Sequence, residues 1–149
     1  MINFAKILAT VGGIGYIPKG GGTMASMVYC LVWVLLPDLS LLFQVVLLIF
    51  VLTAGVWSAT ILEKNWGKDN NRVVIDELAG MIIALLTIPV KLKFVLIALV
   101  LFRFFDILKP LGIRRLEKLP VGWGVMADDV LSGFYSLVIL QLAIKVNLI

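Results

Sequence analysis

Long apolar runs separated by short polar stretches are the dominant pattern of this chain. A helix needs about 20 apolar residues to cross the hydrocarbon layer of a membrane, with a range of roughly 17–25. Five segments reach or approach this length: residues 22–36, 39–62, 74–89, 94–109 and 126–146. Residues 3–13 form a shorter, interrupted apolar stretch, which we expect to lie along the membrane interface. The pattern predicts an all-α, polytopic membrane protein with about five transmembrane or membrane-embedded helices plus a short N-terminal interfacial helix.

The composition favours lipid over water as the surroundings of the chain. Its 149 residues are 62% hydrophobic and 15% charged, whereas a soluble domain is roughly half apolar and a quarter charged. No linker is long enough to separate domains, so we expect one membrane-embedded domain over residues 1–149. Histidine is absent, and the single cysteine, Cys30, lies in an apolar run. The chain therefore lacks the histidine of one class of phosphatases and the CX₅R motif of the class that uses a cysteine nucleophile.

The lysines and arginines predict the orientation of the helices. If the N-terminus is cytoplasmic and five helices alternate, most of them fall on the cytoplasmic side, Arg72 among them. The other side then keeps only Lys91, Lys93 and Lys145. The same arrangement brings every acidic residue of the candidate motifs to the cytoplasmic side. We expect a multi-pass protein with its polar chemistry at that face.

Two adjacent carboxylates, Asp76 and Glu77, begin the third apolar segment in "VVIDELAGM". Gly80 lies four residues after Asp76 on the same helix face, where it would let another helix approach closely. Acidic residues are favoured in the first turn of any helix, which is the simpler explanation. Two neighbouring acids at the start of a helix barely long enough to span the membrane favour a functional role instead.

The motif "GVMADDVLSGF" repeats this arrangement, with Asp128 and Asp129 expected to begin the fifth segment and Gly133 four residues after Asp129. Two carboxylate pairs at one membrane face repel each other unless a cation lies between them. Oxygen ligands without histidine or a usable cysteine favour a hard ion, Mg²⁺ before Ca²⁺ or Mn²⁺. We therefore predict a Mg²⁺ site whose ligands are Asp76, Glu77, Asp128 and Asp129.

The motif "FRFFDILKP" places Arg103 and Asp106 three residues apart on one helix face, with Lys109 three residues further on. An Arg103–Asp106 ion pair that only offsets the cost of burial is one explanation. In the functional interpretation, Arg103 or Lys109 binds phosphate oxygens and Asp106 orients a base or a second metal ion.

The glycine-rich run "GGIGYIPKGGGTMAS" could surround an anion with backbone N–H groups. Thr23 is the expected N-cap of the first span, and Lys19 adds a positive charge. We predict that Lys19, Gly22 and Thr23 bind substrate; a flexible loop is the alternative. The run lacks the GK[ST] sequence of a nucleotide-binding loop, and we expect no nucleic-acid partner.

These groups meet at headgroup depth, where the natural substrate is a phosphorylated lipid. We predict a catalytic set that includes Asp69, which can fold back over the acid site from the preceding loop; the full set is Asp69, Glu77, Asp106 and Asp129. Attack by a metal-activated water and attack by an aspartate on phosphorus both remain open.

The chain resembles the phosphatidylglycerophosphatase A family in four motifs that occur in the family's order and spacing. They are "GIGYIPKGGGTMAS", "KDNNRVVIDELAGM", "LFRFFDILKPLGIRR" and "GVMADDVLSG". The resemblance implies a Mg²⁺-dependent enzyme of the bacterial cytoplasmic membrane that converts phosphatidylglycerophosphate to phosphatidylglycerol and phosphate. The family's polar positions fall on Lys19, Thr23, Asp69, Asp76, Glu77, Arg103, Asp106, Lys109, Asp128 and Asp129.

The chain departs from the family pattern at three positions. Gly21 stands where the family commonly has proline, and Lys68 stands where a histidine often precedes the aspartate. Ile75 replaces a commonly aromatic residue. The first change predicts a looser loop, the second rules out a mechanism that needs that histidine, and the third affects packing.

Three other functions compete with a lipid phosphatase. A CDP-alcohol phosphotransferase would carry a DGxxAR run, which is absent. A carrier or ion-conducting protein would place acids through the depth of the membrane, whereas these acids gather at one face. A non-catalytic lipid-binding or assembly subunit would keep the site without turnover. Homo-oligomerisation is left open by the sequence.

Overall fold

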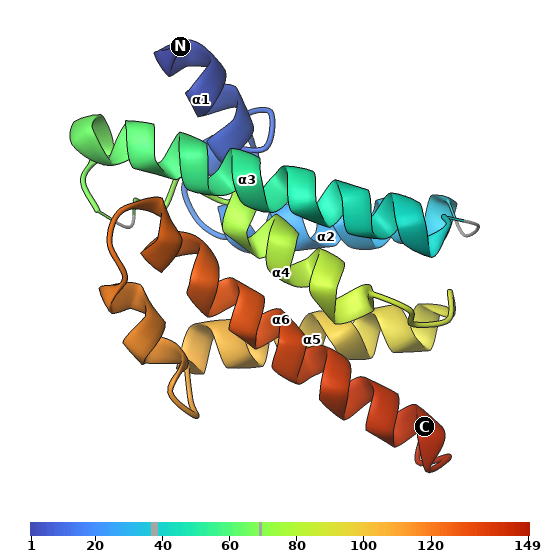
Figure 1. The fold of residues 1–149 in the computed structure, drawn as a ribbon. Helices are drawn as coiled ribbons and strands as arrows, with labels where there is room; N and C mark the ends of the chain where they lie inside the picture. Colours follow the sequence, from blue (N-terminus) through green and yellow to red (C-terminus); the bar gives the residue numbers. More distant parts are fainter. Residues whose placement is uncertain (37–38, 69) are drawn as a thin grey trace.

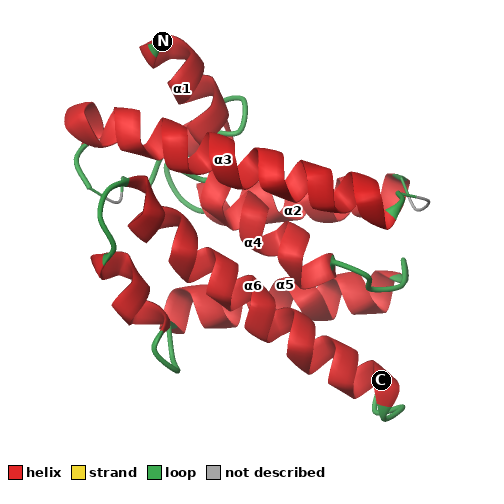
Figure 2. Cartoon of the chain, viewed as in Figure 1, coloured by secondary structure: helices red, strands yellow, loops and turns green. Residues whose placement is uncertain are grey.

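The expectation of an all-helical chain is confirmed by the computed structural model, which describes residues 1–36, 39–68 and 70–149. Within those ranges there are no strands (Figure 2). The described elements, in chain order, are α1 (Ile2–Ala9), η1 (Ile14–Tyr16), α2 (Gly21–Leu35), α3 (Leu41–Trp66), α4 (Ile75–Leu85), α5 (Leu92–Leu108), η2 (Ile113–Lys118) and α6 (Gly122–Lys145). The two η elements are short 3₁₀ helices.

Helix α4 is the centre of the bundle, because it contacts α2, α3, α5 and α6 (Figure 1). It has only 11 residues, about 16 Å at 1.5 Å per residue. All but two of those residues, Glu77 and Leu78, are buried. The longer helices therefore surround a short one, and its first turn lies inside the protein instead of at the surface.

Two glycines allow α4 and α6 to pack backbone against backbone. A Cβ atom on Gly133 of α6 would overlap the carbonyl group of Gly80 on α4. A Cβ atom on Gly80 would in turn lie 2.7 Å from the carbonyl oxygen of Asp129 and against the ring of Phe102. Gly80 thus has the role predicted for it, and its partner is Gly133.

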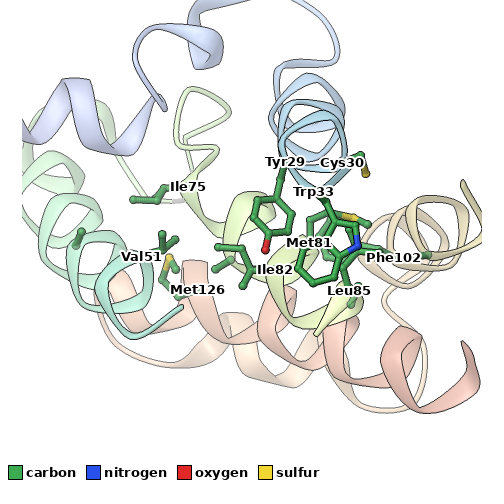
Figure 3. Close-up of a cluster of buried hydrophobic side chains, with 14 of the residues drawn as sticks. Tyr29, Cys30, Trp33, Val51, Ile75, Met81, Ile82, Leu85, Phe102 and Met126 are labelled. Atoms are coloured by element: carbon green, nitrogen blue, oxygen red, sulfur yellow. The ribbon is translucent and has the colours of Figure 1, made fainter. Parts of the chain in front are cut away.

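Large side chains from α2, α3 and α5 complete the core around α4. Tyr29 and Trp33 project from α2 toward Met81 of α4, and Phe102 reaches the same cluster from α5 (Figure 3). A second part of the core joins α3 to α6, where Met126 occupies the space left by Gly55. The core therefore fixes the relative positions of the helices that carry the acidic residues.

The outer surface is strongly apolar. Leu42 of α3 is 73% exposed, Val100 of α5 is 68% exposed and Leu142 of α6 is 56% exposed. Helices α3 and α6 are long and apolar enough to cross a membrane, and α2, with 15 residues, is shorter. Exposed apolar surface of this extent is typical of contact with lipid. Two candidate spans are thus supported, whereas about five is not established.

Three sequence-based boundaries were wrong. Helix α6 begins at Gly122, four residues before the expected start, so Asp128 and Asp129 do not begin it. Helix α2 begins at Gly21 with Gly20 as its N-cap, so Thr23 is not the cap. Helix α4 ends at Leu85, short of the expected residue 89. Glycines at 122 and 124 made the start of α6 look like a loop, although they serve close packing against α3 and the preceding loop.

Candidate active site

Three carboxylates from two helices form the centre of the site. Asp76, Glu77 and Asp129 each offer an oxygen, and these oxygens all lie within 4.8 Å of one another. Asp76 is 8% exposed and Asp129 is 3% exposed. The charged forms of such groups are costly at this depth unless something compensates them.

The local structure explains how the three acids meet. Asp76 and Glu77 lie in the first turn of α4, where the Glu77 backbone N–H donates to Asp76 Oδ1 at 3.1 Å. Asp129 lies in the third turn of α6, which has no acidic residue in its first turn. The general preference for acidic residues in the first turn of a helix therefore applies to Asp76 and Glu77 but not to Asp129.

Arg103 connects this cluster to a fourth carboxylate. On α5, its Nη1 lies 2.5 Å from Asp106 Oδ2 and 3.9 Å from Glu77 Oε1. The Arg103 and Asp106 side chains are 21% and 13% exposed. The Arg103–Asp106 ion pair expected in one of the two explanations is thus present, and it also brings the guanidinium beside the acid cluster. Asp106 and Glu77 both lie within electrostatic reach of Asp129.

Two buried oxygens of the cluster indicate that it could hold a cation. Within the described chain, Glu77 Oε2 and Asp129 Oδ1 are buried and have no hydrogen-bond donor. Buried carboxylate oxygens normally have a donor or a metal ion as partner. Three closely spaced oxygen ligands with no nitrogen or sulfur suit a hard divalent ion. The donor set therefore fits Mg²⁺.

Lys109 and Asp128 lie beside this cluster but bind each other. Lys109 Nζ is 2.5 Å from Asp128 Oδ2 and 2.7 Å from Glu117 Oε1. Burial lowers the pKa of Lys109, but the hydrogen bonds and charges of the two carboxylates outweigh it and raise the pKa on balance. Lys109 is therefore protonated at neutral pH. Asp128 was expected to share the metal site, but the group of three does not include it.

A pocket of about 920 Å³ opens next to Glu77 and Arg103. Its other walls come from the glycine-rich loop and from the loop between α3 and α4; the lining residues are Gly15, Tyr16, Ile17, Pro18, Lys19, Gly20, Gly21, Gly22, Asn65, Trp66, Asn70, Asn71, Arg72, Glu77 and Arg103. The expected substrate residues Lys19, Gly22 and Arg103 thus share one pocket. Thr23 and Lys109 are not among its lining residues.

Gly22 has a clear steric role in this pocket. A Cβ atom there would overlap the carboxylate of Glu77. The start of α2 therefore lies directly against the acid cluster because residue 22 has no side chain. Asp69, a predicted catalytic residue, falls outside the described residues.

Arg72 was missed by the sequence analysis, which counted it only toward topology. Its guanidinium carbon lies 5.6 Å from the centroid of the Trp66 ring and 5.9 Å from that of Tyr16. These two rings meet edge to face at 6.3 Å. The only signal in the sequence was one aromatic residue in each of two stretches, Tyr16 in the glycine-rich run and Trp66 in the charged stretch that carries Arg72. That these two rings meet depends on the tertiary fold.

Comparison with known proteins supplies the family. The model of the family described as Phosphatidylglycerophosphatase A matches residues 7–144. A Bacteroides thetaiotaomicron protein provisionally named a phosphatidylinositol-3-phosphatase is 41% identical over 150 residues, covering 95% of this chain and 94% of that protein.

Two further relatives carry the family name phosphatidylglycerophosphatase A. The Haemophilus influenzae protein is 37% identical over 145 residues, covering 93% of this chain and 88% of its own length. The Escherichia coli protein is 32% identical over 139 residues, covering 91% and 81%. No solved structure gives a significant match to the chain.

Proposed function

Since the chain belongs to the phosphatidylglycerophosphatase A family of phosphatases, we propose that it hydrolyses the terminal phosphomonoester of phosphatidylglycerophosphate in a Mg²⁺-dependent reaction. The products are phosphatidylglycerol and inorganic phosphate. The observation that carries this proposal is the meeting of Asp76, Glu77 and Asp129 within 4.8 Å beside a pocket that also contains arginine. Such a site suits a phosphate ester held by arginine on one side and, on the other, by a metal ion that the carboxylates would bind.

In this proposal Asp76, Glu77 and Asp129 hold Mg²⁺. The buried, unpartnered oxygens of Glu77 and Asp129 and the lack of nitrogen or sulfur ligands in the group support this choice. The bound ion would supply positive charge to a phosphate oxygen and to a reacting water. Asp128 takes a different role from the one first expected, because it orients Lys109 at the edge of the site.

The remaining polar residues bind and orient the phosphate. Arg103 can direct donors of its guanidinium toward phosphate oxygens while Asp106 holds it in place. Lys19 adds positive charge to the same pocket. Two routes fit this arrangement. In one, Asp129 would accept a proton from the water that attacks phosphorus, and phosphatidylglycerol leaves. In the other, Asp129 would attack phosphorus, phosphatidylglycerol leaves, and water then hydrolyses the acyl phosphate to release inorganic phosphate. Asp106, once released from Arg103, is the other carboxylate placed for either step. Asp69 stays a candidate for the same work.

A second substrate is favoured by the relative from Bacteroides thetaiotaomicron. That protein is named for phosphatidylinositol 3-phosphate and is 41% identical to this chain. Phosphatidylinositol 3-phosphate and phosphatidylglycerophosphate have the same anionic groups, a phosphodiester next to the glycerol backbone and a phosphomonoester on the headgroup alcohol. Both belong in any test of the reaction.

We place the protein as a single-domain, multi-pass component of the bacterial cytoplasmic membrane with its site toward the cytoplasm. Helices α3 and α6 as candidate spans, the exposed apolar surface and the bacterial relatives support this placement. The orientation rests on the distribution of lysine and arginine. The C-terminal end of α3 and the N-terminal end of α6 lie on the same side of the bundle, and the N-terminal end of α4 is directed toward that side (Figure 1), so the acids would lie nearer one membrane surface.

The test is release of inorganic phosphate from phosphatidylglycerophosphate and from phosphatidylinositol 3-phosphate by the purified protein in detergent, with Mg²⁺ or with EDTA. We expect phosphate to be released from phosphatidylglycerophosphate in Mg²⁺ and not in EDTA. Asp76→Asn, Glu77→Gln and Asp129→Asn should each lose turnover and remain folded. If all three variants keep near-normal activity, the proposed site is wrong. A carrier, an ion-conducting protein or a non-catalytic subunit would release no phosphate under any of these conditions.

A further inference from the structure

Arg72 differs from Arg103 and Lys109 in what holds it. Arg103 and Lys109 are bound to carboxylates, whereas Arg72 has no carboxylate within ion-pair distance among the residues that the structure describes. Its guanidinium instead lies near the rings of Trp66 and Tyr16. A guanidinium held by aromatic rings keeps its N–H donors available, because the rings interact with its face.

The backbone around Arg72 is fixed. The Arg72 N–H donates to Asn70 Oδ1 at 3.1 Å, and Asn70 Nδ2 donates to the Trp66 carbonyl at 2.9 Å. The Arg72 carbonyl packs so closely on Gly15 that a Cβ atom there would overlap it. The loop that carries Arg72 is therefore docked on the glycine-rich loop and does not hang free at the surface.

The pocket consequently has two separate positive groups. Arg103 lies at the acid cluster with Glu77, and Arg72 and Lys19 lie on the two loops that form the other walls. A substrate whose phosphomonoester is bound beside Arg103 would meet Arg72 with another part of its headgroup. The chemical group that matches an available guanidinium is a second phosphate.

We propose that Arg72, held by Tyr16 and Trp66, binds the phosphodiester of the lipid and selects substrates that carry two phosphates. This inference rests on the proposed function and adds its specificity: phospholipids with both a phosphodiester and a phosphomonoester are accepted, and phosphatidic acid, with a monoester alone, is a poor substrate. Trp66 and Tyr16 act as positioning residues for Arg72.

The test compares phosphatidylglycerophosphate with phosphatidic acid of the same acyl chains. For Arg72→Ala we expect kcat/KM on phosphatidylglycerophosphate to fall roughly 10- to 100-fold, mainly through KM, since a hydrogen bond to a charged group is worth that much. On phosphatidic acid the same variant should change kcat/KM less than about threefold. Arg114→Ala, an exposed arginine outside the pocket, is the matched control and should leave both substrates unchanged.

Further variants separate binding from folding. Arg72→Lys keeps the charge but loses the planar pair of donors, so it should recover part of the loss on phosphatidylglycerophosphate. Trp66→Leu should lower kcat/KM on phosphatidylglycerophosphate by less than Arg72→Ala does. Like Arg72→Ala, it should leave kcat/KM on phosphatidic acid nearly unchanged. An equal loss on both lipids, or none on either, would overturn the inference while leaving the proposed function intact.

If the unmodified protein releases phosphate from neither lipid, the proposed function fails. Calorimetric binding of the same two lipids in detergent then still decides the role of Arg72. Tighter binding of phosphatidylglycerophosphate that depends on Arg72 supports the inference, and equal binding with and without Arg72 overturns it.

Discussion

Replacing Asp76 with asparagine is expected to abolish the reaction and yet stabilise the protein when no divalent ion is present. The reason is the distance of at most 4.8 Å among the oxygens of Asp76, Glu77 and Asp129. Asparagine has the size of aspartate and keeps an oxygen that can accept the Glu77 N–H. The substitution therefore removes a negative charge and little else.

The magnitude follows from the spacing of these charges. Two ionised carboxylates 4.8 Å apart repel each other by about 3.5 kcal/mol at an effective dielectric constant of 20. Asp76 has two such neighbours, but Arg103, 3.9 Å from Glu77, offsets part of the repulsion. We expect a net gain of about 1–3 kcal/mol in EDTA, and each kcal/mol raises Tm by about 2–4 °C in a chain of this size.

Thermal unfolding followed by tryptophan fluorescence, with EDTA and with Mg²⁺, measures this effect. Mg²⁺ should raise the Tm of the unmodified protein and have much less effect on Asp76→Asn. The matched control is Asp106→Asn, which removes the carboxylate paired with Arg103 and should lower Tm in EDTA. A lower Tm for Asp76→Asn in EDTA, or an equal response of both proteins to Mg²⁺, would refute the electrostatic reasoning.

Three other predictions concern packing and binding. Gly133→Ala places a methyl group on the backbone of Gly80, and should destabilise the fold by about 1–3 kcal/mol, measured as a fall in Tm that Mg²⁺ does not reverse. Arg103→Lys keeps a charge beside the acids but loses the bidentate geometry, so KM in the phosphate-release assay should rise roughly 10-fold, and an unchanged KM would exclude a phosphate contact. The double variant Arg114→Ala/Arg115→Ala changes two exposed residues and should alter kcat/KM less than about threefold; a large loss would show that these arginines contact the headgroup.

The helices were predictable wherever a long apolar run stood between clear polar boundaries. Helix α3, expected at residues 39–62, is Leu41–Trp66, and α5, expected at 94–109, is Leu92–Leu108. The start of α6 was missed because Gly122 and Gly124 resemble a loop in sequence. Their purpose, close approach to neighbouring backbone, exists only in the folded chain.

The sequence was enough to predict which types of residue make up the candidate site, but not which of them form ion pairs with one another. A glycine follows Asp76 by four residues and another follows Asp129 by four residues, and this spacing predicted close helix packing next to each acid. The two helices do meet at those glycines. Nothing in the sequence indicated that Lys109 would pair with Asp128, nineteen residues away. Long-range ion pairs of this kind depend on how the helices cross.

The backbone contact between Gly80 and Gly133 also bears on how such an enzyme can change over evolutionary time. It holds the proposed hydrolytic acids on two packed helices, while the headgroup contacts proposed for Lys19 and Arg72 come from two separate loops. Under the proposed function, mutations in those loops can therefore redirect the enzyme to a new lipid without moving the acids on the helices.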